Sequence, residues 1–312
     1  MKKIVILISI ILVFALIVFS YNKTQKKDIQ ISFYSWENSF EEQNINEKLY
    51  IKVLDINFST KLELLKTNLK ETPKDFIPVT YITNETMKNV DYSLVSKAIL
   101  ETLKNYKFDE IQIDCDWSLS TRSNYFNLLE DLKEKLNKKI SATIRLHQIK
   151  YYTKTGIPPV DYGVLMYYNM SNIGDFNTKN SILDNEIAKK YHYNFDVYPL
   201  KLKLALPLYS QAIQFREEKA ISLFEGVEEK DFNNDFEKLE NNRYKVLNSH
   251  YFKGRYIYKD DIFRLENSNE QDIKIALKDF LDLSKNRYDE VIFYTLKYKN
   301  KYDLNNLIKG NL

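Results

Sequence analysis

The stretch Phe108–Trp117 reads Phe-Asp-Glu-Ile-Gln-Ile-Asp-Cys-Asp-Trp and alternates polar with apolar side chains. Because successive side chains of a strand point to opposite faces, Gln112, Asp114 and Asp116 share one face. In a barrel covered by helices, the apolar face packs against the helices and the polar face enters the interior. Two carboxylates at the carboxyl end of this strand therefore converge near the barrel mouth, where barrel enzymes keep their catalytic groups.

Short runs rich in β-branched and aromatic residues recur along the chain, and segments of helical periodicity separate several of them. The predicted strands are Ile31–Trp36, Leu49–Ile56, Pro78–Thr83, Glu110–Asp116, Ile140–His147, Val164–Asn169, Leu202–Leu208 and Val291–Leu296. The predicted helices are Tyr92–Tyr106, Arg122–Leu136, Ile182–His192 and Asp272–Leu283. Strands that alternate with helices indicate a parallel sheet, and this number of strands suggests closure. We therefore predict an α/β fold, a (β/α)8 TIM-type barrel.

The connection between the last two predicted strands is too long for a single helix. Residues 210–269, approximately, contain an acidic, asparagine-rich stretch and a β-like pair, Tyr251–Tyr258 and Ile262–Glu266, which turns at 259–261. Because another barrel strand follows, we interpret this segment as an insertion packed beside the barrel. One barrel domain of residues 31–312 would then contain it.

The chain begins with Met1-Lys2-Lys3 and an apolar run from Ile4 to Phe19. This run is shorter than the roughly 20 residues that span a bilayer comfortably, and it is long for the core of a signal peptide. We expect residues 1–20 to be either a cleaved signal peptide or an uncleaved membrane anchor, followed by a linker over 21–30. The protein would then be extracytoplasmic, secreted or anchored, and would touch the membrane only through this segment.

Composition excludes several classes of protein. Lys+Arg 46 against Asp+Glu 43 gives a net charge of only +3, which argues against a nucleic-acid binder. The 6 glycines are too widely spaced for a phosphate-binding loop, and the single cysteine and 3 dispersed histidines do not suggest a zinc site. We therefore predict no cofactor and no metal. The 24 tyrosines and 18 phenylalanines suit a sugar-binding cleft, although the nucleotide bias of an AT-rich genome would also produce them.

The predicted strand Ile140–His147 repeats the alternation and places Arg145 and His147 beside the carboxylates. Two interpretations stay open. Perturbed carboxylates cluster at functional sites. Structural ion pairs also occur in protein interiors, and Arg145 would in that case merely neutralise Asp114.

The segment Phe108–Trp117 resembles the catalytic strand of the chitinase-like glycoside hydrolases of family 18, whose pattern is Asp-Gly-x-Asp-x-Asp-x-Glu. Asp109 matches the first Asp and Asp114 the third, while Gln112 replaces the second. Asp116 stands where the catalytic Glu belongs. Two further segments resemble family motifs in the same order. They are Met166–Asn169, for Met-x-Tyr-Asp, and Leu204–Tyr209, for Gly-Leu-Pro-Phe-Tyr.

Over a longer span, from about residue 31 to the end, the chain resembles an uncharacterised bacterial family, domain of unknown function 3142. The phrases that carry this likeness are Leu49–Asp55, Ile111–Trp117, Ser141–Gln148, Pro158–Asp161 and Leu165–Met170. This second resemblance is closer, but it implies no activity because none is assigned to that family.

The family 18 resemblance implies a substrate-assisted mechanism, in which the N-acetyl oxygen of the substrate attacks the anomeric carbon and one protein acid suffices. Asp116 would be the general acid, Asp114 would orient the acetamido group, and Tyr168 would hydrogen-bond its oxygen. The residues expected to bind substrate are Trp36, Gln112, Trp117, Arg145, His147, Asn169 and Tyr209. The expected partner is a glycan, and the expected reaction is hydrolysis of an N-acetylated sugar polymer.

Three residues depart from the family pattern. Asp116 is one methylene shorter than Glu, and neither Gln112 nor Asn169 can carry the charge of the Asp that it replaces. These departures fit an altered glycosidase, or an inactive envelope protein that binds glycan in the same cleft. A third alternative is a metal-dependent hydrolase in which Asp114, Asp116 and His147 hold the metal.

Overall fold

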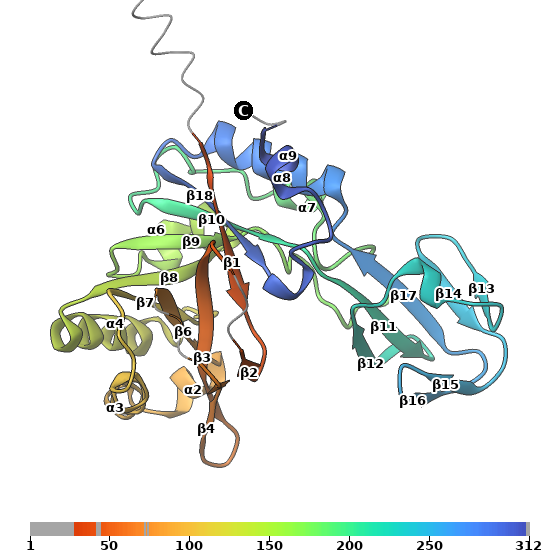
Figure 1. Ribbon diagram of the computed structural model, residues 1–312, viewed down its shortest axis with the longest axis horizontal. Helices are drawn as coiled ribbons and strands as arrows, with labels where there is room; N and C mark the ends of the chain where they lie inside the picture. Colours follow the sequence, from red (N-terminus) through yellow and green to blue (C-terminus); the bar gives the residue numbers. More distant parts are fainter. Residues whose placement is uncertain (1–27, 42–44, 72, 74, 310–312) are drawn as a thin grey trace, which may run out of the picture.

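The computed structural model describes residues 28–41, 45–71, 73 and 75–309. Within these residues, eight parallel strands close into a barrel in the order β1-β18-β10-β9-β8-β7-β6-β3, with β1 also pairing with β3. The predicted (β/α)8 TIM-type barrel is thus confirmed. Figure 1 shows helices outside the barrel and the insertion projecting from one side of it.

Each barrel strand overlaps a segment predicted from the sequence. The barrel strands are β1 (Gln30–Ser35), β3 (Lys48–Phe58), β6 (Phe76–Ile82), β7 (Glu110–Asp114), β8 (Lys139–Arg145), β9 (Tyr162–Met166), β10 (Leu202–Pro207) and β18 (Arg287–Tyr294). β4 (Leu62–Lys66) pairs with β3 as an antiparallel strand, and the short β2 (Ser39–Phe40) pairs with β5 (Asn68–Leu69).

The long helices follow the predicted periodicity. They are α3 (Tyr92–Leu103), α4 (Arg122–Leu136) and α8 (Glu270–Leu283). The shorter elements are α2 (Asn84–Asn89), α5 (Leu146–Lys150), α6 (Tyr152–Thr155), α7 (Asn185–Lys189), α9 (Leu304–Lys309), η1 (Glu229–Asp231) and η2 (Leu296–Tyr298). The predicted helix Ile182–His192 is too long. The side chain of Asp184 accepts hydrogen bonds from the backbone N–H groups of Glu186 and Ile187 and so caps the helix. α7 therefore begins at Asn185, three residues after the predicted start.

The insertion lies between β10 and β18, as predicted. Its described residues form an antiparallel sheet in the order β12-β11-β17-β14-β13 and a separate hairpin of β15 and β16. The strands are β11 (Ser210–Arg216), β12 (Lys219–Glu225), β13 (Phe236–Lys238), β14 (Arg243–Val246), β15 (His250–Phe252), β16 (Arg255–Ile257) and β17 (Ile262–Asn267).

The predicted pairing of Tyr251–Tyr258 with Ile262–Glu266 is wrong. The first segment folds on itself, because Lys253 and Gly254 both adopt positive φ and make a tight turn between β15 and β16. β17 pairs instead with β11 and β14.

Alternation along β7 builds two separate cores. Ile111, Ile113 and Cys115 are buried in the cluster between the barrel and its helices. Gln112 and Asp114 point inward, where Tyr34, Tyr50, Val164 and other side chains fill the barrel. The face assignment made from the sequence is therefore confirmed.

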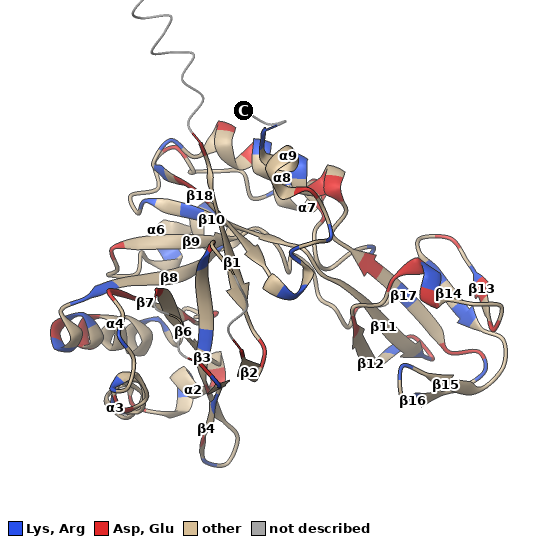
Figure 2. Cartoon of the chain, in the orientation of Figure 1, with Lys and Arg blue, Asp and Glu red and all other residues tan. Residues whose placement is uncertain are grey.

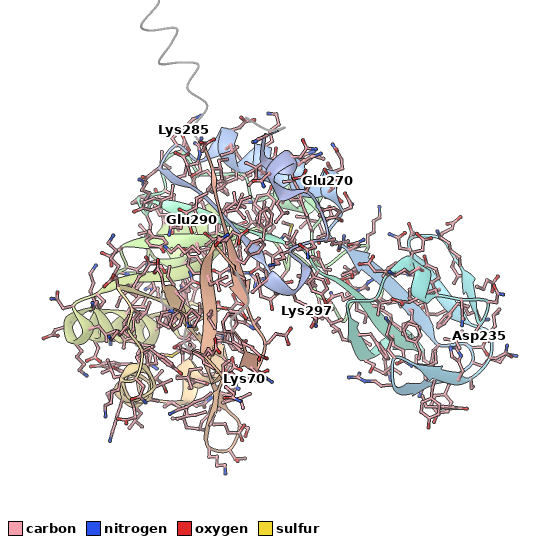
Figure 3. The ribbon with its side chains drawn as sticks, in the orientation of Figure 1. Lys70, Asp235, Glu270, Lys285, Glu290 and Lys297 are labelled. Atoms are coloured by element: carbon pink, nitrogen blue, oxygen red, sulfur yellow. The ribbon has the colours of Figure 1, made fainter. Side chains whose placement is uncertain are left out.

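A buried ion pair lies inside the barrel, toward the amino-terminal ends of the strands. Lys203 Nζ is 2.9 Å from the carboxylate of Glu290, which is labelled in Figure 3. Lys203 also donates to the hydroxyl groups of Tyr50 and Tyr162, at 2.9 and 2.8 Å. Burial lowers the pKa of Lys203, while the charge of Glu290 opposes that shift. The pair is thus enclosed by hydrogen bonds at the end of the barrel opposite the mouth.

The expected signal peptide or anchor, residues 1–20, lies outside the described residues, and so does most of the linker. In the described part of the chain, no helix is long and apolar enough to cross a membrane. Figure 2 shows that acidic and basic residues are interspersed along the barrel and the insertion.

Candidate functional site

Polar and aromatic side chains converge at the carboxyl ends of the barrel strands. β7 supplies Gln112 and Asp114, with Asp116 two residues further on, and β8 supplies Thr143 and Arg145. Because the strands are parallel, their carboxyl ends meet at one mouth of the barrel. This mouth is the candidate site.

Asp114 is the last residue of β7, and only 7% of it is exposed. Thr143 donates a hydrogen bond to its Oδ1 at 2.6 Å. Burial, followed by the negative charge of Asp116, raises the pKa of Asp114 to about 7, although the hydrogen bond from Thr143 opposes the shift. A carboxyl group with this pKa exchanges a proton near neutral pH, as general acid–base catalysis requires.

Asp116 reaches the rim of the mouth, where 53% of its side chain is exposed. Arg145 Nη1 donates to its Oδ2 at 2.9 Å, and Arg145 Nη2 donates to the backbone oxygen of Asn169 at 2.6 Å. Arg145 thus forms its ion pair with Asp116 and not with Asp114, although its positive charge also acts to lower the pKa of Asp114.

Gln112 lies deeper in the barrel and is fully buried. Its Oε1 accepts from the hydroxyl of Tyr34 at 2.6 Å, while its Nε2 has no hydrogen-bond partner among the described residues. A neutral amide costs less free energy to bury than a carboxylate does. Gln112 therefore forms the floor below Asp114 and is not exposed to the cleft.

Tyr294, at the end of β18, is the centre of an aromatic lining that the sequence did not single out. Its ring stacks on Tyr168 at 5.5 Å and contacts Trp36 and Tyr209 at 5.7 and 5.6 Å between centroids. Burial raises the pKa of Tyr168 well above its usual value, so its hydroxyl stays protonated. Rings of this kind offer apolar faces and polar edges, which suits a sugar.

Asn169 ties three strand ends together. Its Oδ1 accepts from the hydroxyl of Tyr209 at 2.7 Å, and its carbonyl accepts from Arg145. Its φ of 56° lies in the left-handed region, which Asn tolerates better than most residues. Asn169 and Tyr209 thus meet at the mouth, as the motif matches suggested.

Of the expected substrate-binding residues, Trp117 lies outside the cleft, as Gln112 does. Trp117 stacks on Tyr125 of α4 at 5.2 Å and donates Nε1–H to the carbonyl of Thr155 at 3.2 Å. It is 4% exposed and shares the outward face of Cys115, so the structure does not place it in the cleft. His147 lies on α5, because β8 ends at Arg145. It is exposed there and lines a small cavity with Arg145, Tyr168 and Asn169.

Sequence reasoning missed Lys52 and Asp55 of β3. A register shift after Lys52 marks a β-bulge, which lets these residues share the interior face although they are three apart. Lys52 donates to Asp55 Oδ2 at 2.8 Å and lies 5.7 Å from the centre of the Trp36 ring. Asp55 Oδ1 has no hydrogen-bond partner among the described residues. The only sequence signal was two charged residues inside a strongly apolar strand.

Two cavities lie near the aromatic lining, one beside Trp36 and the other beside Tyr294. The first, of about 480 Å³, is lined by Trp36, Thr295 and Lys297 among others. The second, of about 400 Å³, lies between the barrel and the insertion and is lined by Arg145, Asn169, Ser171, Ile173, Ser181, Tyr209, Gln211, Leu223, Glu225 and Tyr294. Figure 3 shows Lys297 between the two parts of the molecule. Both volumes fall in the range of small-molecule sites, about 300–1,000 Å³.

Metal binding was the third alternative read from the sequence. Across residues 28–309, leaving out the gaps in the description, no three His, Cys, Asp or Glu side chains form a group that could hold a metal ion. Asp114, Asp116 and His147 therefore do not make the ligand set that a metal-dependent hydrolase would need.

Comparisons with known proteins place the fold. No family model matches the chain, and no curated protein matches it. Among solved structures, a chitinase from Chromobacterium violaceum superposes with a TM-score of 0.54 at 9% identity, over 91% of this chain and 98% of that one. A xylanase-A-amylase inhibitor protein superposes with a TM-score of 0.50 at 10% identity, over 91% and 99%. The Bacillus cereus spore cortex-lytic enzyme SleL gives 0.49 at 13% identity, over 92% and 75%. The chain therefore has a chitinase-like barrel fold.

Proposed function

We propose that this protein is an extracytoplasmic glycoside hydrolase that acts on polymers of N-acetylated sugars. The observation that carries the proposal is the carboxyl pair at the barrel mouth. Asp114 is buried with a pKa of about 7, and Asp116 stands exposed two residues away. The aromatic lining around Tyr294 and the two cavities beside it support the proposal, because their size and character suit a sugar chain.

The reaction would follow the substrate-assisted path. The acetamido oxygen attacks the anomeric carbon as the bond from that carbon to the glycosidic oxygen breaks, and Asp116 gives its proton to the departing oxygen. Asp114 accepts a hydrogen bond from the acetamido N–H and keeps it in position. Tyr168 donates a hydrogen bond from its hydroxyl to the acetamido oxygen, and its raised pKa keeps that hydroxyl protonated. Water then opens the cyclic intermediate and returns a proton to Asp116.

A second candidate function is glycan binding without turnover. The ion pair between Arg145 and Asp116 favours it, because an acid held as a carboxylate cannot protonate the leaving group. The fold does not decide between the two, since both a chitinase and an inhibitor protein share it.

The decisive experiment incubates the purified protein with the N-acetylglucosamine hexamer and with peptidoglycan fragments, and follows products by mass spectrometry. We expect hydrolysis that Asp116→Ala abolishes. The matched control is Asp109→Ala, since the side chain of Asp109 is fully exposed and pairs with Lys138 on the surface. Turnover that survives Asp116→Ala would refute the proposed acid. Hexamer binding without turnover in the wild type would select the second candidate.

Cellular location and family are further parts of the proposal. The basic start and the apolar run Ile4–Phe19 support export, with the segment either cleaved or kept as an anchor. Cell fractionation with sequencing of the mature amino terminus tests this, and a cytoplasmic protein with an intact start would contradict it. The phrases Leu49–Asp55 and Ser141–Gln148, among others, support membership of domain of unknown function 3142.

A further inference from the structure

The loop between β9 and α7, residues 170–181, lies on one face of the insertion sheet. Alternate residues of β11 and β17 share that face, because Ile213 of β11 pairs directly with Arg264 of β17 and Phe215 pairs with Ile262. Phe176 of the loop packs edge-on against Phe215, with ring centroids 5.2 Å apart. A barrel loop is thus seated on the insertion.

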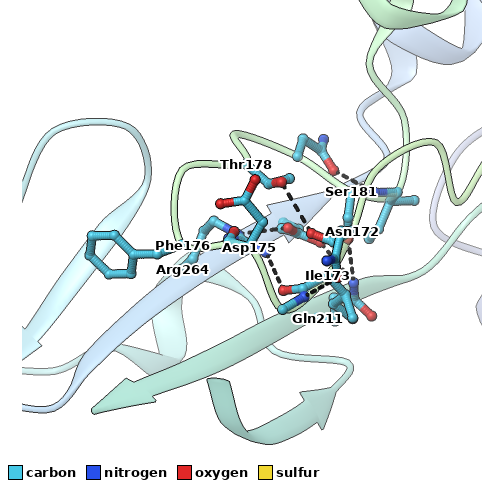
Figure 4. Close-up of polar contacts among 12 residues, drawn as sticks. Asn172, Ile173, Asp175, Phe176, Thr178, Ser181, Gln211 and Arg264 are labelled. Atoms are coloured by element: carbon cyan, nitrogen blue, oxygen red, sulfur yellow. Dashed lines mark hydrogen bonds and ion pairs between the residues drawn. The ribbon is translucent and has the colours of Figure 1, made fainter. Parts of the chain in front are cut away.

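Arg264 holds this loop through its backbone. The side chain is fully buried, and it donates to the carbonyls of Ile173 and Asp175 at 2.8 and 2.6 Å. Its Nε donates to Glu266 Oε1 at 2.7 Å. Figure 4 shows Arg264 among Ile173, Asp175 and Phe176, with its contacts dashed. A planar guanidinium can make three such bonds in different directions, which a lysine ammonium on a flexible stem does not reproduce.

Glu266 holds the other end of the same loop. Its Oε2 accepts from Ser181 Oγ at 2.5 Å and from Gln211 Nε2 at 2.7 Å. Glu266 is 1% exposed, so the ion pair with Arg264 is sealed from solvent. The pair therefore fixes the loop near its start and at its end.

The loop ends connect directly to the candidate site. The N–H of Met170 donates to the carbonyl of Ser181 at 2.9 Å, and the N–H of Asn169 donates to that of Ile182 at 2.8 Å. The carbonyl of Asn169 in turn accepts a hydrogen bond from Arg145, which is the ion-pair partner of Asp116. Ser171, Ile173 and Ser181 of the loop also line the cavity between barrel and insertion. Any shift of the loop would change the shape of that cavity.

A buried ion pair is a weak source of stability, because removing two charges from water offsets most of their attraction. Its contribution is more often to geometry. We propose that the Arg264–Glu266 pair positions residues 170–181 as a wall of the cleft and thereby sets the affinity for glycan chains long enough to reach the insertion. The affinity part of this inference rests on the proposed function, whereas the positioning part stands by itself.

The experiment compares the wild-type protein with Arg264→Lys by hydrogen–deuterium exchange and by titration with the N-acetylglucosamine hexamer. We expect amides of residues 170–181 to exchange at least about 10-fold faster in the variant, while β11 and β12 keep their protection. We expect the Kd for the hexamer to rise about 10-fold and, where the hexamer is hydrolysed, KM to rise by more than kcat falls.

Two further variants keep the test decisive. Arg264→Met combined with Glu266→Met removes both charges and leaves no unpaired ion, so it serves if Arg264→Lys fails to fold. Lys245→Met is the matched control, since it removes a cation from the same sheet that pairs with Asp260 on the surface. It should change neither exchange in the loop nor hexamer affinity.

Unchanged exchange of residues 170–181 in a folded variant would overturn the positioning role. Faster exchange with unchanged hexamer affinity would overturn the role as a cleft wall. If the wild type binds no hexamer, the proposed function and the affinity part fail together, and the exchange result still decides whether the pair positions the loop.

Discussion

Arg145 holds the carboxylate of Asp116 at 2.9 Å on the rim of the cleft, from the strand next to the one that leads to Asp116. The pair fixes the direction of the proposed acid, because the other arm of Arg145 is bonded to the backbone of Asn169. Under the proposed mechanism, substrate would have to separate Arg145 from Asp116 before proton transfer. In the proposed hydrolysis, the reach of the Asp116 side chain from this position would then limit the rate.

Lengthening this side chain tests the point. Asp116→Glu restores the residue of the family 18 pattern and carries the carboxyl group further into the cleft. Because a misplacement of about 1 Å can cost roughly 10²-fold in rate, we expect kcat for hexamer hydrolysis to rise by about 10-fold or more, with little change in Kd. Steady-state kinetics and titration calorimetry measure the two quantities. A fall in kcat would show that the shorter acid is already matched to its substrate.

Asp114 should make the stability of the protein depend on pH. Its pKa is about 7 in the folded protein and 3.8 ordinarily, so between these values the folded protein keeps a proton that the unfolded chain has lost. The stability that this proton gives is complete below about pH 4 and is lost as the pH rises through 7. The unfolding free energy of Asp114→Asn minus that of the wild type should therefore increase by up to about 4 kcal/mol when the pH is raised from about 4 to about 8. Urea unfolding at both values measures this. An equal difference at both pH values would contradict the raised pKa.

The charge of Asp116 is a separate cause of that raised pKa. Asp116→Asn removes the like charge and should move the titration of Asp114 to lower pH, while burial keeps it above the ordinary 3.8. Carbon-13 NMR of the carboxyl group follows this directly. Asp55→Asn should produce a smaller shift in the same direction, because Asp55 acts on Asp114 less strongly than Asp116 does. A larger effect from Asp55 would reverse that order.

Tryptophan fluorescence can report on the cleft. The chain has 2 tryptophans, and Trp117 is buried against Tyr125 behind the barrel wall. Trp117→Phe would leave Trp36, which contacts Tyr294 and lines the larger cavity. We expect the hexamer to change the emission of this variant with the Kd of the wild type. Trp36→Phe is the converse control, and its emission should not respond to the hexamer.

The ion pair inside the barrel should matter for folding and not for the cleft. Lys203→Met leaves Glu290 buried without its partner, which typically costs about 3–5 kcal/mol. Removing both charges, with Lys203→Met and Glu290→Gln, should cost less than the sum of the single changes. Denaturant unfolding gives the three values. Lys189→Met is the control on an exposed pair, for which we expect little change.

The sequence was most informative where one local rule decided the structure. Alternation in Phe108–Trp117 assigned Gln112 and Asp114 to the interior, and the long helices followed their apolar spacing. It was least informative where alternation breaks. The bulge in β3 turned Lys52 and Asp55 to one face, and no pattern in a single sequence locates an extra residue in a strand. For Trp117 the alternation itself holds, since it gives this residue the outward face of Cys115, and the structure buries it there.

The sequence by itself determined the barrel, the insertion and the identity of the two carboxylates at the mouth, because strand and helix periods are local properties of the chain. Tertiary structure alone decided their partners. Thr143 bonds to Asp114 and Arg145 to Asp116 because closing the barrel sets the register of β7 against β8. Likewise, Arg264 and Ile173 meet only because the insertion folds back over a loop some ninety residues earlier in the chain. A contact between residues so far apart depends on how the barrel and the insertion pack together. The pattern of apolar residues within either segment does not predict it.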